Sequence, residues 1–235
     1  MRHDHAPSAL SPGNRDALEL FTPIAKNYER WSTWLSLFQD PRWREEMVAR
    51  IEIQPRAQVL DVAAGTGMIT RLLQSRGHRV VSLDLSASML GAARRRGASA
   101  VLATGEALPF PDGSFDALTF GYLLRYVPEP LAVLCEFARV LRPGAMLGMV
   151  EFGRPGGIWR VPWWCYTRIG LPIGGLLAGP GWSHVGRYLG PSIDAFADKF
   201  RAESLSALWE AAGLVDVRTR RPSLGGGWLM WARRP

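Results

Sequence analysis

A glycine-rich turn directly after an apolar strand constrains this chain more than any other feature. Residues 59–67 read VLDVAAGTG, so a short apolar run enters a turn in which Gly65 and Gly67 tolerate positive φ and let a ligand approach the backbone. A helix-like stretch, Met68 to Gln74, follows at once. A strand, a glycine turn and a helix in this order are typical of a cofactor-binding α/β sheet.

Strand-like and helix-like runs alternate on both sides of this turn, which predicts a Rossmann-like, mostly parallel seven-stranded sheet with helices on both faces. The last strand is expected to pair antiparallel at the sheet edge. The predicted strands are residues 59–62, 80–83, 100–103, 115–120, 145–151, 214–219 and 227–232. The predicted helices are residues 68–74, 87–95, 131–141 and 204–212.

The chain divides into four parts. Residues 1–50 are expected to form a tail and a helical cover, with Phe21 to Arg50 lying over the cofactor crevice, and residues 51–152 form the cofactor-binding core. Residues 153–200 are rich in Gly, Pro and Trp and are interpreted as an inserted substrate lid, with helical patterning resuming near Ala202. Charges and prolines interrupt this stretch, so it is not expected to span a bilayer. Residues 201–235 complete the same domain.

Composition limits the classes of partner. The 235 residues carry a formal net charge of +7, but the basic residues are scattered, so no nucleic-acid partner is expected. Cys135 and Cys165 lack paired spacing, which predicts neither a disulfide nor a zinc site. His3 and His5 flank an acid, yet the first residues are interpreted as a tail, and no metal is expected. The tail also lacks the apolar core of a signal peptide. The two cysteines without paired spacing fit a reducing cytoplasm, so a cytoplasmic protein is expected.

The residues around the turn narrow the choice of cofactor. Asp61 lies inside the strand end and would repel a pyrophosphate, whereas a zwitterionic amino acid can use both the acid and the backbone amides. The third glycine of a dinucleotide site is absent because position 70 is Thr. The turn alone still allows a nicotinamide-dependent oxidoreductase or a turn that holds no ligand.

Two later loops extend the cofactor site. Asp84 ends the second strand nineteen residues after Gly65, where a carboxylate accepts the hydroxyls of a ribose. Ser86 can cap the following helix, and Met89 is expected either to pack or to touch adenine. The loop from Thr104 to Phe110 follows the third strand and is placed to meet the base edge. Three loops at successive strand ends form one crevice.

With these motifs the chain resembles the ubiquinone/menaquinone biosynthesis C-methyltransferases, a family of class I methyltransferases. The resemblance covers most of the chain, through residues 21–28, 35–36, 39–44, 61–67, 84, 88–90, 106–112, 114–116, 139–144, 151–152, 168–170, 188–189, 192–193 and 225–227. It implies S-adenosylmethionine as the cofactor and methyl transfer to a ring carbon of a prenylated benzoquinol or naphthoquinol. The expected cofactor-binding residues are Tyr28, Asp61, Ala63, Gly65, Thr66, Gly67, Thr70, Asp84, Leu85, Met89, Thr104, Gly105, Glu106, Gly121 and Tyr122.

The chain also departs from the family's pattern. Where the family has Asn after its arginine, this chain has Tyr126, and where the family has Glu before Ser-Ile, it has Pro191. Proline cannot accept a proton or a hydrogen bond through its side chain. Thr104 replaces the usual Asn or Asp, although its hydroxyl can still accept from the adenine amine.

Three residues are candidates for catalysis. Arg125 can stabilise a phenolate-like ring or orient a water, its alternative role being a surface salt bridge, and Tyr126 and His184 are the other candidates. The acceptor is expected to be small, aromatic and lipophilic, facing an apolar wall of Trp159, Trp163, Trp164 and Trp182, which are alternatively a lid core or a contact with a membrane surface. A homodimer is also predicted.

Several functional alternatives stay open at this point. They are O- or N-methylation of a specialised metabolite, a nicotinamide-dependent oxidoreductase, and a non-catalytic paralogue that keeps the cofactor. The absent third glycine disfavours the oxidoreductase, and Pro191 makes the paralogue plausible.

Overall fold

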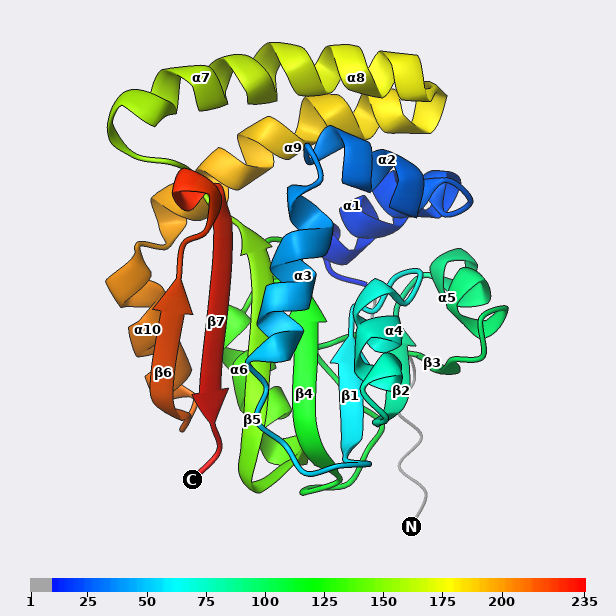
Figure 1. The fold of residues 1–235 in the computed structure, drawn as a ribbon, viewed down its shortest axis with the longest axis vertical. Coiled ribbons are helices and arrows are strands. Elements are labelled where there is room, and N and C mark those ends of the chain that lie inside the picture. Colours follow the sequence, from blue (N-terminus) through cyan, green and yellow to red (C-terminus); the bar gives the residue numbers. More distant parts are fainter. Residues whose placement is uncertain (1–9) are drawn as a thin grey trace.

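Seven strands form one sheet in the order β3-β2-β1-β4-β5-β7-β6 (Figure 1). The computed structural model describes residues 10–235. Neighbouring strands are parallel except for β7, which is antiparallel to both β5 and β6. The strands are β1 (Gln58–Val62), β2 (Arg79–Asp84), β3 (Ser99–Leu102), β4 (Phe115–Gly121), β5 (Leu141–Phe152), β6 (Val215–Arg220) and β7 (Gly227–Arg233). The predicted fold class is confirmed.

The prediction that the last strand forms the sheet edge is wrong. β7 lies between β5 and β6, and all of its residues except Arg233 are buried. The apolar run from Trp228 to Trp231 is buried on both faces of the sheet, as inner strands are. β6, with the polar sequence VDVRTR, is almost wholly exposed and forms that edge, as suits a strand that must not recruit another chain.

Helices cover both faces of the sheet and the end where its parallel strands terminate (Figure 1). Met47 of α3 and Leu73 of α4 are buried in a cluster on one face, and Phe137 of α6 and Trp209 of α10 are buried on the other. The helices of this part are α1 (Pro12–Phe21), η1 (Thr22–Ile24), α2 (Tyr28–Leu35), α3 (Gln39–Ala49), α4 (Met68–Ser75), α5 (Ala87–Arg94), α6 (Pro130–Val140), α10 (Ala202–Ala211) and η4 (Ser223–Gly225). The predicted helical segment from Phe21 to Arg50 is therefore confirmed.

Most of the segment interpreted as an inserted lid is helical, which corrects the expectation that helical patterning resumes only near Ala202. The segment contains η2 (Gly157–Trp159), α7 (Arg160–Cys165), the π-helical turn η3 (Tyr166–Gly170), α8 (Leu171–Ala178) and α9 (Pro180–Lys199). Its glycines serve helix packing: a Cβ on Gly175 would lie 2.4 Å from the carbonyl oxygen of Trp182, and one on Gly186 would lie 2.4 Å from that of Leu171. The small residues thus let α8 and α9 pack closely.

None of the helices within residues 10–235 is long and apolar enough to cross a membrane. The predicted metal alternative at His3 and His5 lies outside the described residues.

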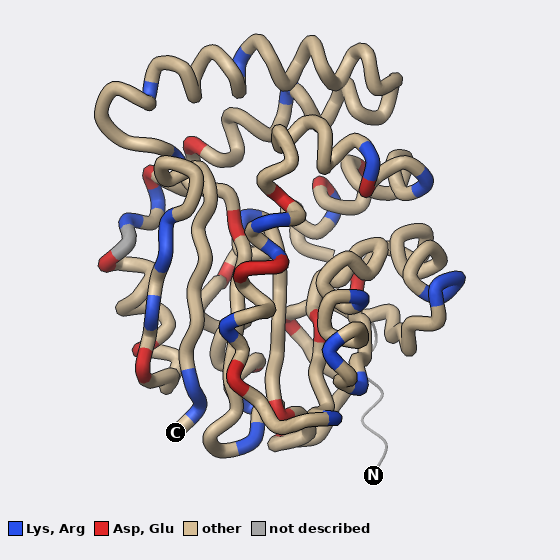
Figure 2. The backbone as a smooth tube through the Cα atoms, in the orientation of Figure 1, with Lys and Arg blue, Asp and Glu red and all other residues tan. Residues whose placement is uncertain are grey.

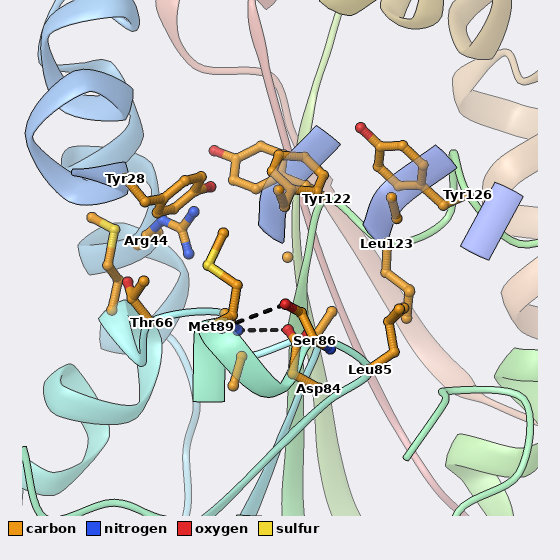
Figure 3. A pocket seen from close by; sticks show the side chains of 17 residues that line it. Tyr28, Arg44, Thr66, Asp84, Leu85, Ser86, Met89, Tyr122, Leu123 and Tyr126 are labelled. Atoms are coloured by element: carbon orange, nitrogen blue, oxygen red, sulfur yellow. Dashed lines mark hydrogen bonds between the residues drawn. The ribbon is translucent and has the colours of Figure 1, made fainter. Parts of the chain in front are cut away.

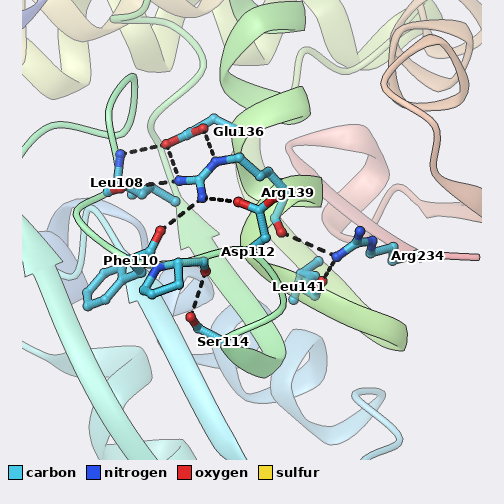
Figure 4. A network of polar contacts seen from close by, with 9 residues as sticks. Leu108, Phe110, Asp112, Ser114, Glu136, Arg139, Leu141 and Arg234 are labelled. Atoms are coloured by element: carbon cyan, nitrogen blue, oxygen red, sulfur yellow. Dashed lines mark hydrogen bonds and ion pairs between the residues drawn. The ribbon is translucent and has the colours of Figure 1, made fainter. Parts of the chain in front are cut away.

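A partly exposed polar network fixes the loop that follows β3 (Figure 4). The guanidinium of Arg139, at the end of α6, donates to Glu136 at 2.8 Å, to the carbonyl of Phe110 at 2.9 Å and to Asp112 at 2.7 Å. Glu136 in turn accepts from the amide of Leu108 at 2.8 Å. The hydrogen bond from Arg139 is the main cause that lowers the pKa of Glu136. The loop is therefore held to α6 along its length.

Candidate active site

A cavity opens where β1, β2 and β4 end, enclosing about 680 Å³ including its mouth. Figure 3 shows Tyr28, Tyr122 and Tyr126 on one side of this space and Asp84 and Ser86 on the other. We call it the cofactor cavity. Its lining residues are Ala17, Phe21, Tyr28, Arg44, Ala63, Ala64, Gly65, Thr66, Met68, Asp84, Leu85, Ser86, Met89, Gly121, Tyr122, Leu123 and Tyr126.

The glycine turn and Asp84 form the polar edge of this cavity. The Asp84 carboxylate accepts the amide N–H of Gly65 and that of Ser86, each at 2.8 Å. Burial raises the pKa of Asp84, against the lowering effect of these amides. Ser86 caps α5 by accepting from the Met89 amide, as predicted. The remaining lone pairs of the carboxylate can accept ribose hydroxyls.

Three lining residues of the same cavity have a left-handed backbone conformation. Ala63, Gly65 and Tyr122 all have positive φ, at 52°, 57° and 58°. Such values are uncommon for residues with a side chain and are typical of binding sites. A Cβ on Gly65 would meet no atom within 4 Å, so this glycine leaves open space that a ligand can occupy.

Asp61 and Thr70, both predicted to bind the cofactor, lie beneath the turn rather than in the cavity. The Asp61 carboxylate is fully buried and accepts from the hydroxyls of Thr70 at 2.7 Å and Thr119 at 3.0 Å. Burial raises the pKa of Asp61 to about 6, against the lowering by these hydroxyls. Both residues therefore support the turn from below.

Four further predicted residues, Gly67, Thr104, Gly105 and Glu106, are also absent from the lining. Glu106 instead accepts a hydrogen bond of 2.8 Å from Asn14, at the start of α1. The sequence pattern did not reveal that α1 would pack on this loop. The nine predicted residues that do line the cavity are Tyr28, Ala63, Gly65, Thr66, Asp84, Leu85, Met89, Gly121 and Tyr122.

Arg44 is the most consequential lining residue that was not predicted. Its buried guanidinium donates to Asp40 at 2.7 Å, and Asp40 also accepts from the Tyr122 hydroxyl at 2.5 Å. Arg44 thus gives the cavity a positive charge that suits a carboxylate ligand. Its only sequence signal was its place in the QDPRWR segment.

Glu29 attaches α2 to the glycine turn. Its carboxylate accepts from the Thr66 hydroxyl at 2.7 Å and from two guanidinium nitrogens of Arg71 at 2.9 Å. Arg96 also pairs with it. Burial alone would raise the pKa of Glu29, but the hydrogen bonds from Arg71 and Thr66, together with the charges of Arg71 and Arg96, lower it. The helical cover is therefore fixed to the cofactor cavity by charge.

A second cavity adjoins the first and shares Phe21, Tyr28 and Tyr122 with it. It encloses about 670 Å³ including its mouth, and we call it the acceptor cavity. Most of its lining is apolar or aromatic: Phe21, Tyr28, Ser32, Leu35, Ser36, Asp40, Tyr122, Arg125, Phe152, Trp163, Tyr166, Leu171, Trp182, Val185, Leu189 and Ile193. Of the four predicted wall tryptophans, Trp163 and Trp182 line it, whereas Trp159 and Trp164 are exposed elsewhere.

Arg125 lies in this second cavity as part of a buried ion pair. Its Nε lies 3.0 Å from Glu151 Oε1, with side-chain exposures of only 2% and 1%, and its Nη1 lies 3.4 Å from the Ser192 hydroxyl. The alternative of a surface salt bridge is therefore wrong. Burial raises the pKa of Glu151, against the lowering by Arg125.

The other two catalytic candidates differ in position. Tyr126 lines the cofactor cavity, its hydroxyl is buried without a partner, and its ring stacks on Tyr188 with centroids 6.2 Å apart. His184 is exposed on α9 and lines neither cavity. The structure therefore brings Arg125 and Tyr126, but not His184, to the site.

The residues of the first cavity fit S-adenosylmethionine. Asp84 offers an acceptor for ribose, Arg44 a cation for the carboxylate, and the side chains of Met68, Leu85 and Met89 an apolar surface for the base.

Comparison with known proteins agrees with this geometry. A model of the ubiE/COQ5 methyltransferase family matches residues 12–231. A demethylmenaquinone methyltransferase from Mycolicibacterium gilvum is 36% identical over 222 residues, covering 94% of each chain. One from Corynebacterium glutamicum is 41% identical over 140 residues, covering 60% of this chain and 61% of that relative.

Solved structures share the fold at low sequence identity. A possible histamine N-methyltransferase from Thermotoga maritima has a TM-score of 0.64 at 19% identity, covering 93% of this chain and 99% of that one. Phosphoethanolamine N-methyltransferase 2 from Haemonchus contortus, solved with S-adenosyl-L-methionine, has a TM-score of 0.67 at 13% identity, covering 98% and 61%. The chain belongs to the ubiE/COQ5 methyltransferase family, as a class I enzyme that uses S-adenosylmethionine.

Proposed function

We propose that this protein methylates a ring carbon of a prenylated quinol, with the ring held in the acceptor cavity. The observation that carries the proposal is one buried guanidinium, Arg125, in a mostly apolar, aromatic-lined space beside the cofactor cavity. A flat lipophilic ring suits such a lining. The naming of the relatives as demethylmenaquinone methyltransferases supports a naphthoquinol.

The cofactor supplies an electrophilic methyl group, so the protein's task is to align the ring carbon, activate it and exclude water. Carbon methylation needs an electron-rich ring, and a ring hydroxyl that has lost its proton is such a donor. The Arg125 guanidinium is the group that stabilises this oxyanion. As the new carbon–carbon bond forms, the carbon–sulfur bond breaks and the ring carbon must then lose its proton.

Asp40 is our candidate for the base that accepts this proton. It lines the acceptor cavity, and its Oδ1 is engaged by Arg44 and Tyr122. Its Oδ2 is buried with no hydrogen-bond partner among residues 10–235. A buried carboxylate oxygen without a partner is costly and is often found at functional sites.

Pro191 does not weaken this proposal. It lies inside α9 and is absent from the lining of the acceptor cavity, although the surface depression that it lines with Tyr188 and Lys199 also includes Arg125. The replacement of the family's Glu therefore removes no acid from the cavity that we assign to the ring, which argues against a non-catalytic paralogue.

The test is methyl transfer from S-adenosylmethionine carrying ¹³C in its methyl group to a panel of benzoquinols and naphthoquinols. We expect a ring-methyl carbon signal in the product, reduced by roughly a hundredfold or more in Asp40→Asn, as for loss of a general base. Asp40→Asn can keep the bonds to Arg44 and Tyr122, and His184→Gln is the matched control with unchanged turnover. An O-methyl signal, or no product from any quinol, would refute ring-carbon methylation.

Contact with a membrane surface, dimer formation and a cytoplasmic location were also predicted from the sequence, and they stay predictions.

A further inference from the structure

A third hollow adjoins the acceptor cavity beside α7. It encloses about 980 Å³ including its open mouth, and we call it the outer groove. It lies between the α2–α3 connection, η2 with α7, and η4. Its lining residues are Ser36, Leu37, Gln39, Trp43, Phe152, Pro155, Trp159, Pro162, Trp163, Tyr166, Ser223, Leu224 and Gly226.

The outer groove and the acceptor cavity are continuous in their walls. Ser36, Phe152, Trp163 and Tyr166 line both. Tyr166 opens the π-helical turn η3, a local widening of the helix that is frequent at functional sites. A ligand too long for the acceptor cavity therefore meets the outer groove next.

Most polar side chains of the groove are already engaged by the protein, whereas the indole N–H of Trp163 is buried with no hydrogen-bond partner among residues 10–235. The Ser223 hydroxyl donates to Gln39 Oε1 at 2.7 Å and accepts from the Trp43 indole at 3.0 Å. Gln39 Nε2 donates to the Leu37 carbonyl at 3.1 Å, and the Ser36 hydroxyl to the Thr33 carbonyl at 3.0 Å. The groove therefore suits a ligand that has few or no polar groups.

Exposed apolar side chains surround the mouth. Leu37 is 64% exposed, Leu224 62% and Trp159 47%, and they come from three separate segments. Leu37 and Leu224 have φ of 52° and 59°, values that side chains rarely adopt and that point to a functional constraint. Acidic residues are absent from residues 157–178, which form η2 to α8 (Figure 2).

We propose that the outer groove binds the hydrocarbon tail of the methyl acceptor while the ring occupies the acceptor cavity. The inference rests on the proposed function for the existence of a tailed acceptor. It adds a binding site that would make the enzyme select acceptors by their tail as well as by their ring.

The first test measures binding without catalysis. Isothermal titration with farnesol, a prenyl alcohol that has no ring, is carried out on the wild type, on Leu37→Glu and Leu224→Glu at the mouth, and on Leu177→Glu. Leu177 is 79% exposed on α8 and outside the groove, so it is the matched control. We expect Kd to rise at least fivefold in both mouth variants and to stay within about twofold in the control, since burial of one or two CH₂ groups is worth that factor.

The second test compares kcat/KM for a naphthoquinol with and without a prenyl tail. We expect the wild type to prefer the tailed acceptor by roughly tenfold or more and both mouth variants to lose most of that preference. If neither acceptor is methylated, the proposed function fails, and the farnesol titration still decides on the groove. The proposal that the outer groove binds the tail would be overturned if the wild type did not bind farnesol. It would also be overturned if Leu177→Glu weakened farnesol binding as much as the mouth variants do, since the contact would then lie on the outer face of α8.

Discussion

Replacing Arg125 by Met should unfold the protein at a markedly lower temperature as well as stop turnover. The change removes the charge and keeps an apolar side chain against the rings of Tyr126 and Phe152, over which the guanidinium lies at 5.4 Å and 5.5 Å. What it leaves behind is Glu151, 1% exposed, with one oxygen bonded to its own neighbour's amide and the other without a partner.

The magnitude follows from the burial of the pair. Removing one partner of a buried ion pair costs about 3–5 kcal/mol because the other charge is left uncompensated. In a domain of this size each kcal/mol lowers Tm by about 2–4 °C, so the expected fall is about 6–20 °C. A surface pair would contribute only about 0–1 kcal/mol, and the two cases are therefore easy to separate.

The loss of Tm in Arg125→Met should depend on pH in a defined direction. Burial raises the pKa of Glu151 above its usual 4.5 even with Arg125 present, and losing the arginine raises it further. A raised carboxyl pKa in the folded state stabilises the protein below the unfolded pKa, and that stability is lost as pH rises through the folded value. The Tm gap between wild type and Arg125→Met should therefore be smaller at pH 5 than at pH 8.

Thermal unfolding by circular dichroism at both pH values checks this. The double variant Arg125→Met/Glu151→Gln should regain at least half of the lost Tm without regaining methyl transfer, since the buried charge is gone but the oxyanion has no cation. An equal Tm gap at pH 5 and pH 8, or turnover restored in the double variant, would refute the reasoning.

Three further changes test the site. Asp84→Ala should raise the Kd of S-adenosylhomocysteine roughly tenfold or more, because a charged acceptor is lost, and a change below twofold by isothermal titration would contradict the ribose role. Thr70→Val should lower the free energy of unfolding by about 1–3 kcal/mol, measured with denaturant at pH 8, and should leave Kd for the cofactor within about threefold of the wild-type value. A large rise in Kd would show that Thr70 contacts the cofactor after all. Glu29→Gln, whose carboxylate is partly exposed, should cost about 1 kcal/mol or less yet speed proteolytic cleavage within α2, and unchanged cleavage would show that Glu29 does not anchor that helix.

Local pattern was enough to predict the strands and the lining at the glycine turn. Strand ends such as Asp84 follow from short-range periodicity, and the turn glycines from their conformational freedom. The same pattern could not tell that Asp61 and Thr70 point beneath the turn, because the direction of a side chain depends on what packs over it. For Thr70 the deciding neighbour is Asp61 itself, at 2.7 Å.

Long-range contacts account for the other differences. Arg44 reaches the cofactor cavity because α3 packs beside Tyr122, a contact between residues 78 positions apart that no periodicity reports. The Gly- and Pro-rich texture of residues 153–200 was interpreted as an inserted lid after which helical patterning resumes, whereas the segment is itself helical and its glycines let α8 and α9 pack closely. In this segment the content of glycine and proline indicates how closely the helices pack, but it does not indicate whether helices form.

The Arg125–Glu151 pair links these observations to function. A buried ion pair is weak evidence for stability, because well-packed apolar residues of similar volume often stabilise a core as well or better. This pair joins Glu151, near the end of β5, to a residue just beyond β4, and Arg125 also lies within 3.4 Å of Ser192 on α9. It therefore holds a cation at a fixed place in the acceptor cavity and bonds that cavity's helical wall to the sheet. For stability alone, well-packed apolar residues would serve as well as this pair. The pair is better explained by the proposed function, which needs a cation held at a fixed place to stabilise an oxyanion.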